Sequence, residues 1–195
     1  CYEGGETAKR EKVDFIIGIG GGSPLDAAKA IALYATNDLS VFDIYDKAKN
    51  NPLPIIAIPT TAGTGSEVTP YSVLTISSEN TKRTVKRDDI FPCVAFLDAN
   101  YTKSLPKSIT QNTGLDALSH ALESILCKNS SDISEIFAKE AITYLSKGLS
   151  EEYEKENARE NMLYGSMLAG CAIAHSGTTI VHLLGYPLTC VLDIP

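Results

Sequence analysis

The chain has 195 residues, of which 44% are hydrophobic and 21% are charged, as in soluble globular proteins that bury a sizeable core. Its net charge of -7 gives no electrostatic support for a nucleic-acid partner, and no apolar run reaches the roughly 18 residues of a membrane helix. The five cysteines show no C-x-x-C spacing and the first residues form no signal-peptide pattern, so we expect a cytoplasmic protein with reduced thiols.

The start of the chain shows the order strand, glycine turn, helix. Residues 13–19 are a short apolar run rich in β-branched residues, which is typical of a buried parallel strand, and Gly20, Gly21 and Gly22 follow it. Ser23 suits a helix N-cap and Pro24 the first helical position, so we expect a small-residue helix to about residue 35.

Four more segments continue this alternation. Residues 40–46 can form one helical turn, residues 54–58 a second buried strand and residues 92–97 a third. Between the last two, residues 71–76 alternate as a strand does, with a hairpin partner near residues 81–85.

The pattern changes near residue 104. Helical spacing then appears at residues 110–126, 132–147, 157–175 and 178–185. We therefore predict two domains with a cleft between them, an α/β domain at residues 1–104 and an all-α domain at residues 105–195.

Two glycine-rich loops follow predicted strands. Gly20–Ser23 leads into a helix, whose free N–H groups and dipole suit a pyrophosphate, although such a turn also occurs without any ligand. Thr60–Glu67 is rich in hydroxyl side chains, and its alternative is a surface loop stabilised by those hydroxyls. Ligands of open α/β sheets bind beyond the carboxyl ends of the strands, so both loops can line one nucleotide crevice.

The helical half contains a candidate metal site. Asp116 and His120 are four residues apart, which places them on one face of a helix, and His182 on a later apolar helix is a possible third ligand. A carboxylate with imidazoles suits Fe(II) or Zn(II) holding a substrate oxygen. The alternatives are a surface Asp-His pair and a satisfied core histidine.

Four blocks of sequence carry a resemblance to a known family. They are Gly20–Lys29, Ile58–Thr69, Thr113–Glu123 and Gly177–Leu188. In their order and spacing the chain resembles the iron-containing (group III) alcohol dehydrogenases, and the second and third blocks are the most specific. The resemblance implies interconversion of an alcohol and its aldehyde or ketone with NAD or NADP.

The resemblance also implies a fold and a set of site residues. The fold is a Rossmann-like α/β dinucleotide-binding part followed by an all-α metal-binding part, both incomplete here. The implied cofactor-contacting residues are Gly21, Gly22, Ser23, Asp26, Thr60, Thr61, Thr64, Thr69, Tyr71, Lys82 and Thr102. The implied metal ligands, which act in catalysis through Fe(II) or alternatively Zn(II), are Asp116, His120 and His182.

The chain departs from the family pattern at several places. It begins at Cys1 and ends at Pro195, before the family's fourth metal-binding histidine, so we expect an internal fragment that lacks the N-terminal segment and most of the helical domain. Tyr186 stands where many members have a further histidine, and His175 where a polar residue is common. We expect the chain alone to be inactive or nearly so, although three ligands can still hold zinc.

Two kinds of alternative function remain, a related enzyme of the same architecture and a protein without catalytic activity. A glycerol-type polyol dehydrogenase, or a cyclising sugar-phosphate enzyme like dehydroquinate synthase, shares the same architecture, although the loop at residues 60–67 favours the iron type. A truncated, catalytically silent nucleotide-binding module is the other alternative. For the enzyme we expect a small-molecule alcohol or aldehyde substrate, neither nucleic acid nor membrane as partner, and a homo-oligomer.

Overall fold

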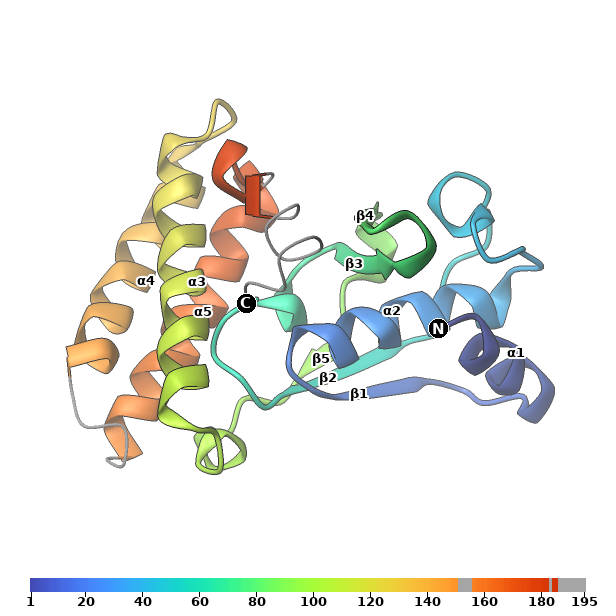
Figure 1. Cartoon of the computed structure of the whole chain (residues 1–195), viewed down its shortest axis with the longest axis horizontal. Coiled ribbons are helices and arrows are strands. Elements are labelled where there is room, and N and C mark those ends of the chain that lie inside the picture. The colour runs from blue at the N-terminus through green and yellow to red at the C-terminus, as the bar shows by residue number, and fades with distance from the viewer. Residues whose placement is uncertain (151–155, 183, 186–195) are drawn as a thin grey trace.

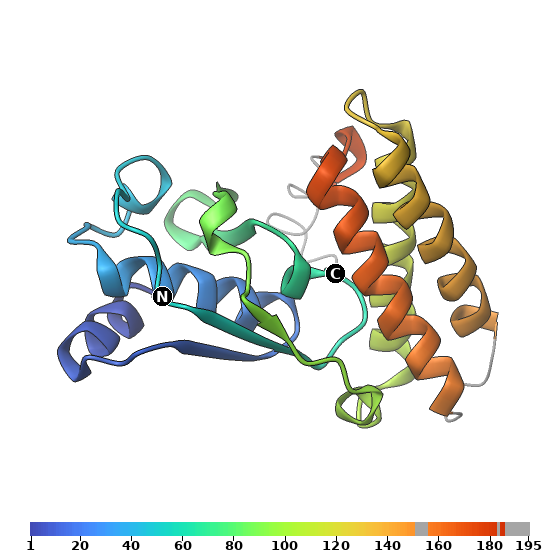
Figure 2. The same ribbon diagram turned by 180° about the vertical axis from the view of Figure 1, so that it is seen from behind.

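The computed structural model describes residues 1–150, 156–182 and 184–185, and it places an α/β half beside a helical half (Figures 1 and 2). The α/β half contains α1 (Tyr2–Glu11), β1 (Ile16–Gly20), α2 (Gly22–Thr36), β2 (Ile55–Pro59), β3 (Tyr71–Ile76), β4 (Thr81–Lys86) and β5 (Val94–Ala95). The helical half contains α3 (Lys107–Leu126), α4 (Asp132–Ser150) and α5 (Glu156–Ser176). The predicted fold class is thus confirmed, and the proposed division at residue 104 falls between β5 and α3.

A three-stranded parallel sheet organises the first half. Its order is β1-β2-β5, and α2 is the crossover that brings β2 parallel to β1. The small residues of α2 let it lie close on the sheet, since a Cβ on Gly18 of β1 would be only 2.9 Å from Cβ of Ala28. The carboxyl ends of the strands therefore meet at one edge, next to the start of α2.

The expectation of a first strand buried on both faces is wrong. Ile17 and Ile19 of β1 are 49% and 61% exposed, because α2 covers only the opposite face of the sheet. The strand also begins at Ile16, three residues later than expected. The third predicted strand is shortened to Val94–Ala95.

The start of α2 also differs from the expectation. The N-cap is Gly21, so Ser23 and Pro24 are the second and third residues of the helix and not its cap and first position. Proline is tolerated there because the first-turn N–H groups have no helical acceptor. The consequence is that the glycine turn itself supplies the first helical N–H group.

The sequence did not reveal helix α1. It packs against α2, where a Cβ on Gly5 would lie 2.1 Å from Cβ of Tyr34. With two glycines and few apolar residues, α1 shows no clear helical spacing of hydrophobic residues, since glycine disfavours helices and has no apolar side chain. Contact with α2 therefore stabilises α1.

The hairpin and the long helices match their predictions closely. β3 and β4 pair antiparallel from Tyr71↔Lys86 to Ile76↔Thr81, and one 3-10 turn at Asp43–Tyr45 replaces the turn expected at residues 40–46. Helices α3, α4 and α5 pack around a core rich in alanine and leucine. Residues 180–182 and 184–185 are helical within the last predicted helix, and Tyr186 lies outside the described residues.

The two halves are in direct contact. Arg159 of α5 donates to the backbone carbonyls of Thr102 and Leu105, in the segment that leads into α3. Tyr71 of β3 donates its hydroxyl to the carbonyl of Ile173 in α5 (3.3 Å). In the described ranges, no helix has the length and apolar character needed to cross a membrane.

Candidate cofactor cleft and metal centre

The cleft opens where the first two parallel strands end. β1 ends at Gly20 and β2 at Pro59, so the loops that follow them meet at one edge of the sheet. The backbone N–H of Thr60 donates to the carbonyl of Gly20 (2.8 Å). A Cβ on Gly22 would lie 2.6 Å from Cγ2 of Thr64. The glycine turn and the threonine-rich loop therefore form one continuous wall.

The first turn of α2 supplies donors to this wall. Gly20 has a φ of +147°, which glycine adopts readily and other residues rarely do. Gly22 and Ser23 then open the helix and line the cleft, so backbone N–H groups without helical acceptors lie at its edge. The positive end of the helix dipole adds to them, which makes this end suitable for a phosphate group.

A buried lysine fixes the second loop against α2. Nζ of Lys29 donates to the backbone carbonyls of Tyr71 (2.6 Å) and Thr69 (3.0 Å). It also donates to Oγ of Ser66 (2.8 Å). Burial lowers the pKa of Lys29 to about 8, and the nearby Asp26 carboxylate opposes that effect. Lys29 thereby holds the chain at three points, from Ser66 in the loop to the first residue of β3.

Asp26 lines the cleft, but protein donors already occupy its carboxylate. Oδ1 accepts from the hydroxyl of Ser66 (2.6 Å) and Oδ2 accepts from the backbone N–H of Val73 (2.8 Å). Burial raises the pKa of Asp26, while the Lys29 ammonium acts in the opposite direction. Asp26 therefore joins α2 to both the loop and the hairpin, and its contact with a cofactor stays a prediction.

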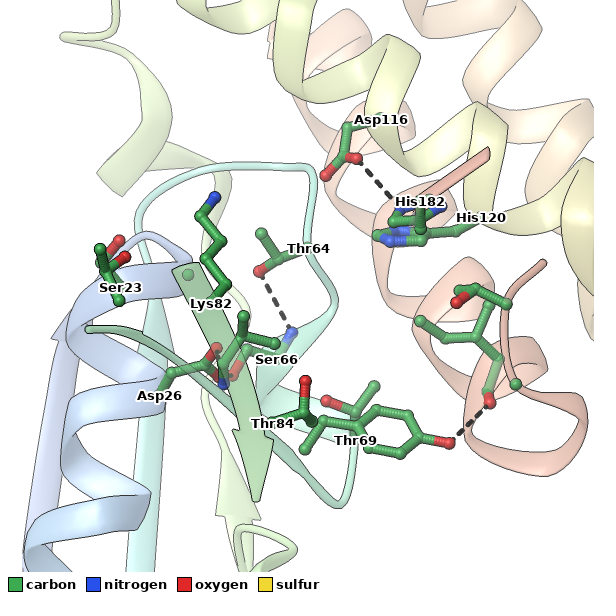
Figure 3. Close-up of a pocket in the computed structure, with 17 residues that line it drawn as sticks. Ser23, Asp26, Thr64, Ser66, Thr69, Lys82, Thr84, Asp116, His120 and His182 are labelled. Atoms are coloured by element: carbon green, nitrogen blue, oxygen red, sulfur yellow. Dashed lines mark hydrogen bonds and ion pairs between the residues drawn. The ribbon is translucent and has the colours of Figure 1, made fainter. Parts of the chain in front are cut away.

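The hairpin forms the next part of the cleft. Its register pairs Val73 with Thr84 and Thr75 with Lys82, and all four residues line the cleft. Tyr71 joins them because alternate residues of a strand point to the same face. In Figure 3 the side chain of Lys82 extends along this wall beside Ser23 and Thr64, so a cation stands near the start of α2.

Three potential metal ligands meet on the opposite, helical wall. Asp116 and His120 lie one turn apart on α3, and His182 comes from the helical residues that follow Gly177. One ligand atom of each lies within 4.8 Å of the others, and Nε2 of His182 is 3.5 Å from Oδ1 of Asp116. The rings of His120 and His182 stack with centroids 4.4 Å apart, as Figure 3 shows.

The chemistry of this cluster fits a divalent metal ion. Nδ1 of His120 and Nε2 of His182 are buried without a hydrogen-bond partner in the described part of the chain, and such atoms are rare without a ligand. Burial lowers the pKa of His120, which favours the neutral ring that a ligand needs. Metal bonds of about 2.1 Å require ligand atoms at most about 4.2 Å apart, so small side-chain rotations would close the set.

The carboxylate of the cluster is also in its ligating form. Burial acts to raise the pKa of Asp116, but the neighbouring His182 and His120 bring it below its usual value. Two imidazoles and a carboxylate are donors that Fe(II) and Zn(II) both accept. The arrangement therefore supports the predicted ligand set without separating the two metals.

Glu123 is a neighbour of this centre that the sequence did not single out. Its Oε1 lies 2.5 Å from Nδ1 of His182, on the side of the ring away from Asp116. Burial acts to raise the pKa of Glu123, but donors led by Thr179 lower it to about 2. Its spacing of three residues from His120 places it on the same face of α3, which is the signal that could have revealed it.

The predicted site residues divide into two groups. Those lining the cleft of about 510 Å³ are Gly22, Ser23, Asp26, Thr64, Thr69, Tyr71, Lys82, Asp116, His120 and His182. Those not lining it are Gly21, Thr60, Thr61 and Thr102. Thr102 is 3% exposed and its hydroxyl donates to the carbonyl of Ala99 (2.8 Å), so it lies behind the wall. Thr75, Thr84 and Thr178 line the cleft without having been predicted.

Both parts of the chain match models of a known protein family. Residues 1–99 match the family model described as iron-containing alcohol dehydrogenase, and residues 110–195 match the C-terminal model of the Fe-containing alcohol dehydrogenase family. The chain belongs to the iron-containing alcohol dehydrogenase family. The resemblance seen in the four sequence blocks is thereby confirmed.

Individual family members resemble the chain over nearly its whole length. Long-chain-alcohol dehydrogenase 1 of Geobacillus thermodenitrificans is 42% identical over 93% of the chain and 47% of its own length. A solved iron-containing alcohol dehydrogenase from Thermotoga maritima is 45% identical, with a TM-score of 0.90 over 100% of this chain and 55% of that one. A sulfoacetaldehyde reductase from Bifidobacterium kashiwanohense, solved with NAD+, is 39% identical, with a TM-score of 0.90 over 98% and 52%. The chain thus spans about half the length of these relatives.

Proposed function

We propose that this chain carries the cofactor cleft and metal centre of an oxidoreductase that interconverts an alcohol and its aldehyde or ketone with NAD or NADP. One observation carries the proposal: a single cleft of about 510 Å³ is lined by the first turn of α2 at one wall and by Asp116, His120 and His182 at the other. A cofactor phosphate bound at the first wall would leave the rest of the cofactor extending toward the second.

The residues that line the cleft would bind the cofactor and orient it relative to the substrate. The N–H groups of Gly22 and Ser23 would bind the pyrophosphate, and the Lys82 ammonium would add attraction for its negative charge. Tyr71 and Thr75 would contact the cofactor between the pyrophosphate and the metal centre. Holding cofactor and substrate in one cleft converts their encounter into an oriented, intramolecular step.

Asp116, His120 and His182 would hold the metal ion. A divalent ion held there supplies Lewis-acid polarisation of a substrate alcohol or carbonyl oxygen. The buried ring nitrogens of His120 and His182, which have no hydrogen-bond partner among the described residues, support this role. We favour Fe(II), with Zn(II) as the alternative, because the donor set accepts both.

The proposal also covers the substrate class, the cellular location, the oligomeric state and the partners. The relatives named above are named for an alcohol and for an aldehyde, so we propose a small-molecule alcohol or aldehyde as substrate. We also propose a cytoplasmic homo-oligomer that binds neither nucleic acid nor membrane.

The test measures cofactor reduction by the metal-loaded protein. Protein purified anaerobically is loaded with Fe(II) or Zn(II), given NAD+ or NADP+ with a short primary alcohol or glycerol, and followed by the absorbance of the reduced nicotinamide. We expect little or no turnover by the chain alone. Whatever turnover the wild type shows should be lost in Asp116→Asn and kept in Glu140→Gln, which changes an exposed carboxylate on α4. A protein that binds neither reduced cofactor nor metal would overturn the proposal.

Two other outcomes would select the alternative functions. Faster oxidation of glycerol than of primary alcohols would identify a polyol dehydrogenase. Binding of cofactor and metal without turnover would identify the chain as a catalytically silent module. The second alternative has support in the exposed apolar residues of β1, because parallel sheets are ordinarily covered on both faces.

A further inference from the structure

Glu123 accepts four hydrogen bonds beside the metal centre. Its Oε1 accepts from the hydroxyl of Ser119 (2.8 Å) and from Nδ1 of His182 (2.5 Å). Its Oε2 accepts from the backbone N–H of Thr179 (2.7 Å) and from the Thr179 hydroxyl (2.6 Å). The residue is only 4% exposed, so these four donors replace water around the carboxylate.

We infer that Glu123 is a positioning residue that sets the tautomer and orientation of His182; this inference rests on the proposed metal centre. A carboxylate only accepts hydrogen bonds, so the contact requires the proton of the neutral imidazole to be on Nδ1. The lone pair is then on Nε2, which is the nitrogen buried beside Asp116 without a hydrogen-bond partner among the described residues. Metal-binding histidines are commonly oriented in this way by a second carboxylate.

Glu123 also holds the backbone that carries His182. Thr179 lies three residues before His182, directly after the turn at Gly177, and Glu123 binds both its N–H and its hydroxyl. Glu123 itself lies on α3, three residues after His120. One carboxylate therefore ties the segment that carries the third ligand to the helix that carries the first two.

Replacing Glu123 by glutamine tests whether its carboxylate positions His182 or only fills space. Glu123→Gln keeps the shape but replaces one acceptor oxygen by an NH2 donor. With the NH2 group at the Oε2 position, it would oppose the N–H of Thr179, whose hydrogen cannot turn away. With the NH2 group at the Oε1 position, it would require Nδ1 of His182 to accept, which moves the ring proton to Nε2 and removes the ligating lone pair. Either arrangement damages the third ligand.

The test combines a metal-binding readout with one that needs no metal. Zinc affinity is measured by competition with a chromophoric chelator for the wild type, Glu123→Gln and Ser124→Ala. Ser124 is the matched control, because it is buried on the same helix and bonds Ser176 but does not touch His182. Imidazole 15N chemical shifts of the metal-free proteins, at a pH where the rings are neutral, report the tautomer of each of the three histidines.

We expect Glu123→Gln to lower zinc affinity about 10–100-fold, and Ser124→Ala to leave it within about threefold. We expect the metal-free wild type to carry the His182 proton on Nδ1. In the variant this preference should weaken, because the tautomer changes wherever the NH2 group occupies the Oε1 position. Unchanged zinc affinity in Glu123→Gln, or an Nε2–H tautomer in the wild type, would overturn the inference. If the wild type binds no zinc but shows an Nδ1–H tautomer that Glu123→Gln weakens, the proposed metal function fails while the positioning role stands.

Discussion

Gly65 and Gly170 pack backbone against backbone where the two halves of the molecule meet. A Cβ on Gly65 would lie 2.6 Å from Cα of Gly170, and a Cβ on Gly170 would lie 2.9 Å from Cα and O of Gly65. Gly65 also has a φ of +60°, a conformation that favours glycine. The loop that carries Thr64 and Ser66 thus rests directly on α5, so the separation of the two cleft walls depends on the absence of these side chains.

The first prediction concerns this contact. Gly170→Ala would push a methyl group into the backbone of Gly65 and the side chain of Val68, and we expect it to lower the free energy of unfolding by about 1–3 kcal/mol. It should also weaken cofactor binding, because the loop must move. Gly185→Ala is the control, since a Cβ there meets no atom of the described residues within 4 Å. Chemical denaturation measures the free energy of unfolding of both variants. Equal stability of Gly170→Ala and Gly185→Ala would contradict the close packing of Gly170 on Gly65.

The second prediction concerns the cation on the hairpin wall. Lys82 and Arg83 are neighbours on β4, but Lys82 lines the cleft whereas the guanidinium of Arg83 lies over the ring of Tyr45 and pairs with Glu79. Loss of a charge-assisted bond to a phosphate costs about 1.5–3 kcal/mol, so Lys82→Ala should weaken NADH or NADPH binding roughly 10–100-fold.

Fluorescence titration of the reduced cofactor gives the measurement, and Arg83→Ala supplies the control. Arg83→Ala removes the same charge one residue away on the other face of the strand, and cofactor affinity should stay within about twofold. An equal loss in both variants would show that overall charge, and not the position of Lys82, attracts the cofactor. No loss in either would remove Lys82 from the cofactor site.

The third prediction is a pH dependence caused by Lys29. The pKa of its ammonium is lowered from 10.5 to about 8, so the folded state binds fewer protons than the unfolded state between those values. Stability contributed by Lys29 should therefore rise with pH across this window, by at most about 1.4 kcal/mol per pH unit.

The measurement compares urea unfolding of wild type and Lys29→Met from pH 8 to 10.5. At neutral pH the variant should be less stable by about 3 kcal/mol, because it leaves Asp26 without its buried partner. The stability difference should then grow with pH. If the stability difference between wild type and Lys29→Met fell as pH rises, the folded state would favour the charged form of Lys29.

The fourth prediction concerns the uncovered face of the sheet. The register places Ile17, Ile56 and Val94 side by side on the face opposite α2, and Ile19 further along it is 61% exposed. A contiguous apolar face of this kind promotes association. Sedimentation velocity should show self-association that Ile19→Lys reduces and Ile136→Lys, at an equally exposed site on α4, does not. A concentration-independent monomer in the wild type would contradict this.

Local chemistry made much of the fold predictable. The apolar run before Gly20, the alternation in residues 71–76 and the helical spacing after residue 104 each reflect one period of hydrophobic residues, and the structure has an element at each place. The metal cluster was equally readable, since Asp116 and His120 share one helical face. His182, on a later apolar segment, was a possible third ligand from the sequence alone, and the resemblance then placed it in the ligand set.

Features that depend on tertiary contacts could not be predicted from the sequence. Helix α1 is stabilised by the close approach of Gly5 to Tyr34, which no local pattern records. Asp26 is an expected cofactor contact, but the sequence did not show that Ser66 of the second loop and Val73 of β3, 40 and 47 residues later, donate to its two oxygens. The spacing of Glu123 from His120 could have placed it near the site, but its contact with Thr179 could not be predicted, because the two residues become neighbours only in the fold.

The most direct test of the account is the metal content of anaerobically purified protein, by elemental analysis of the wild type and His120→Ala. The account predicts near-stoichiometric Fe or Zn in the wild type and its loss in the variant, because His120→Ala removes one of the three potential ligands. Retention of metal in His120→Ala would place the ion elsewhere. Absence of metal from both proteins, even after reconstitution, would contradict the central claim that Asp116, His120 and His182 form a metal centre.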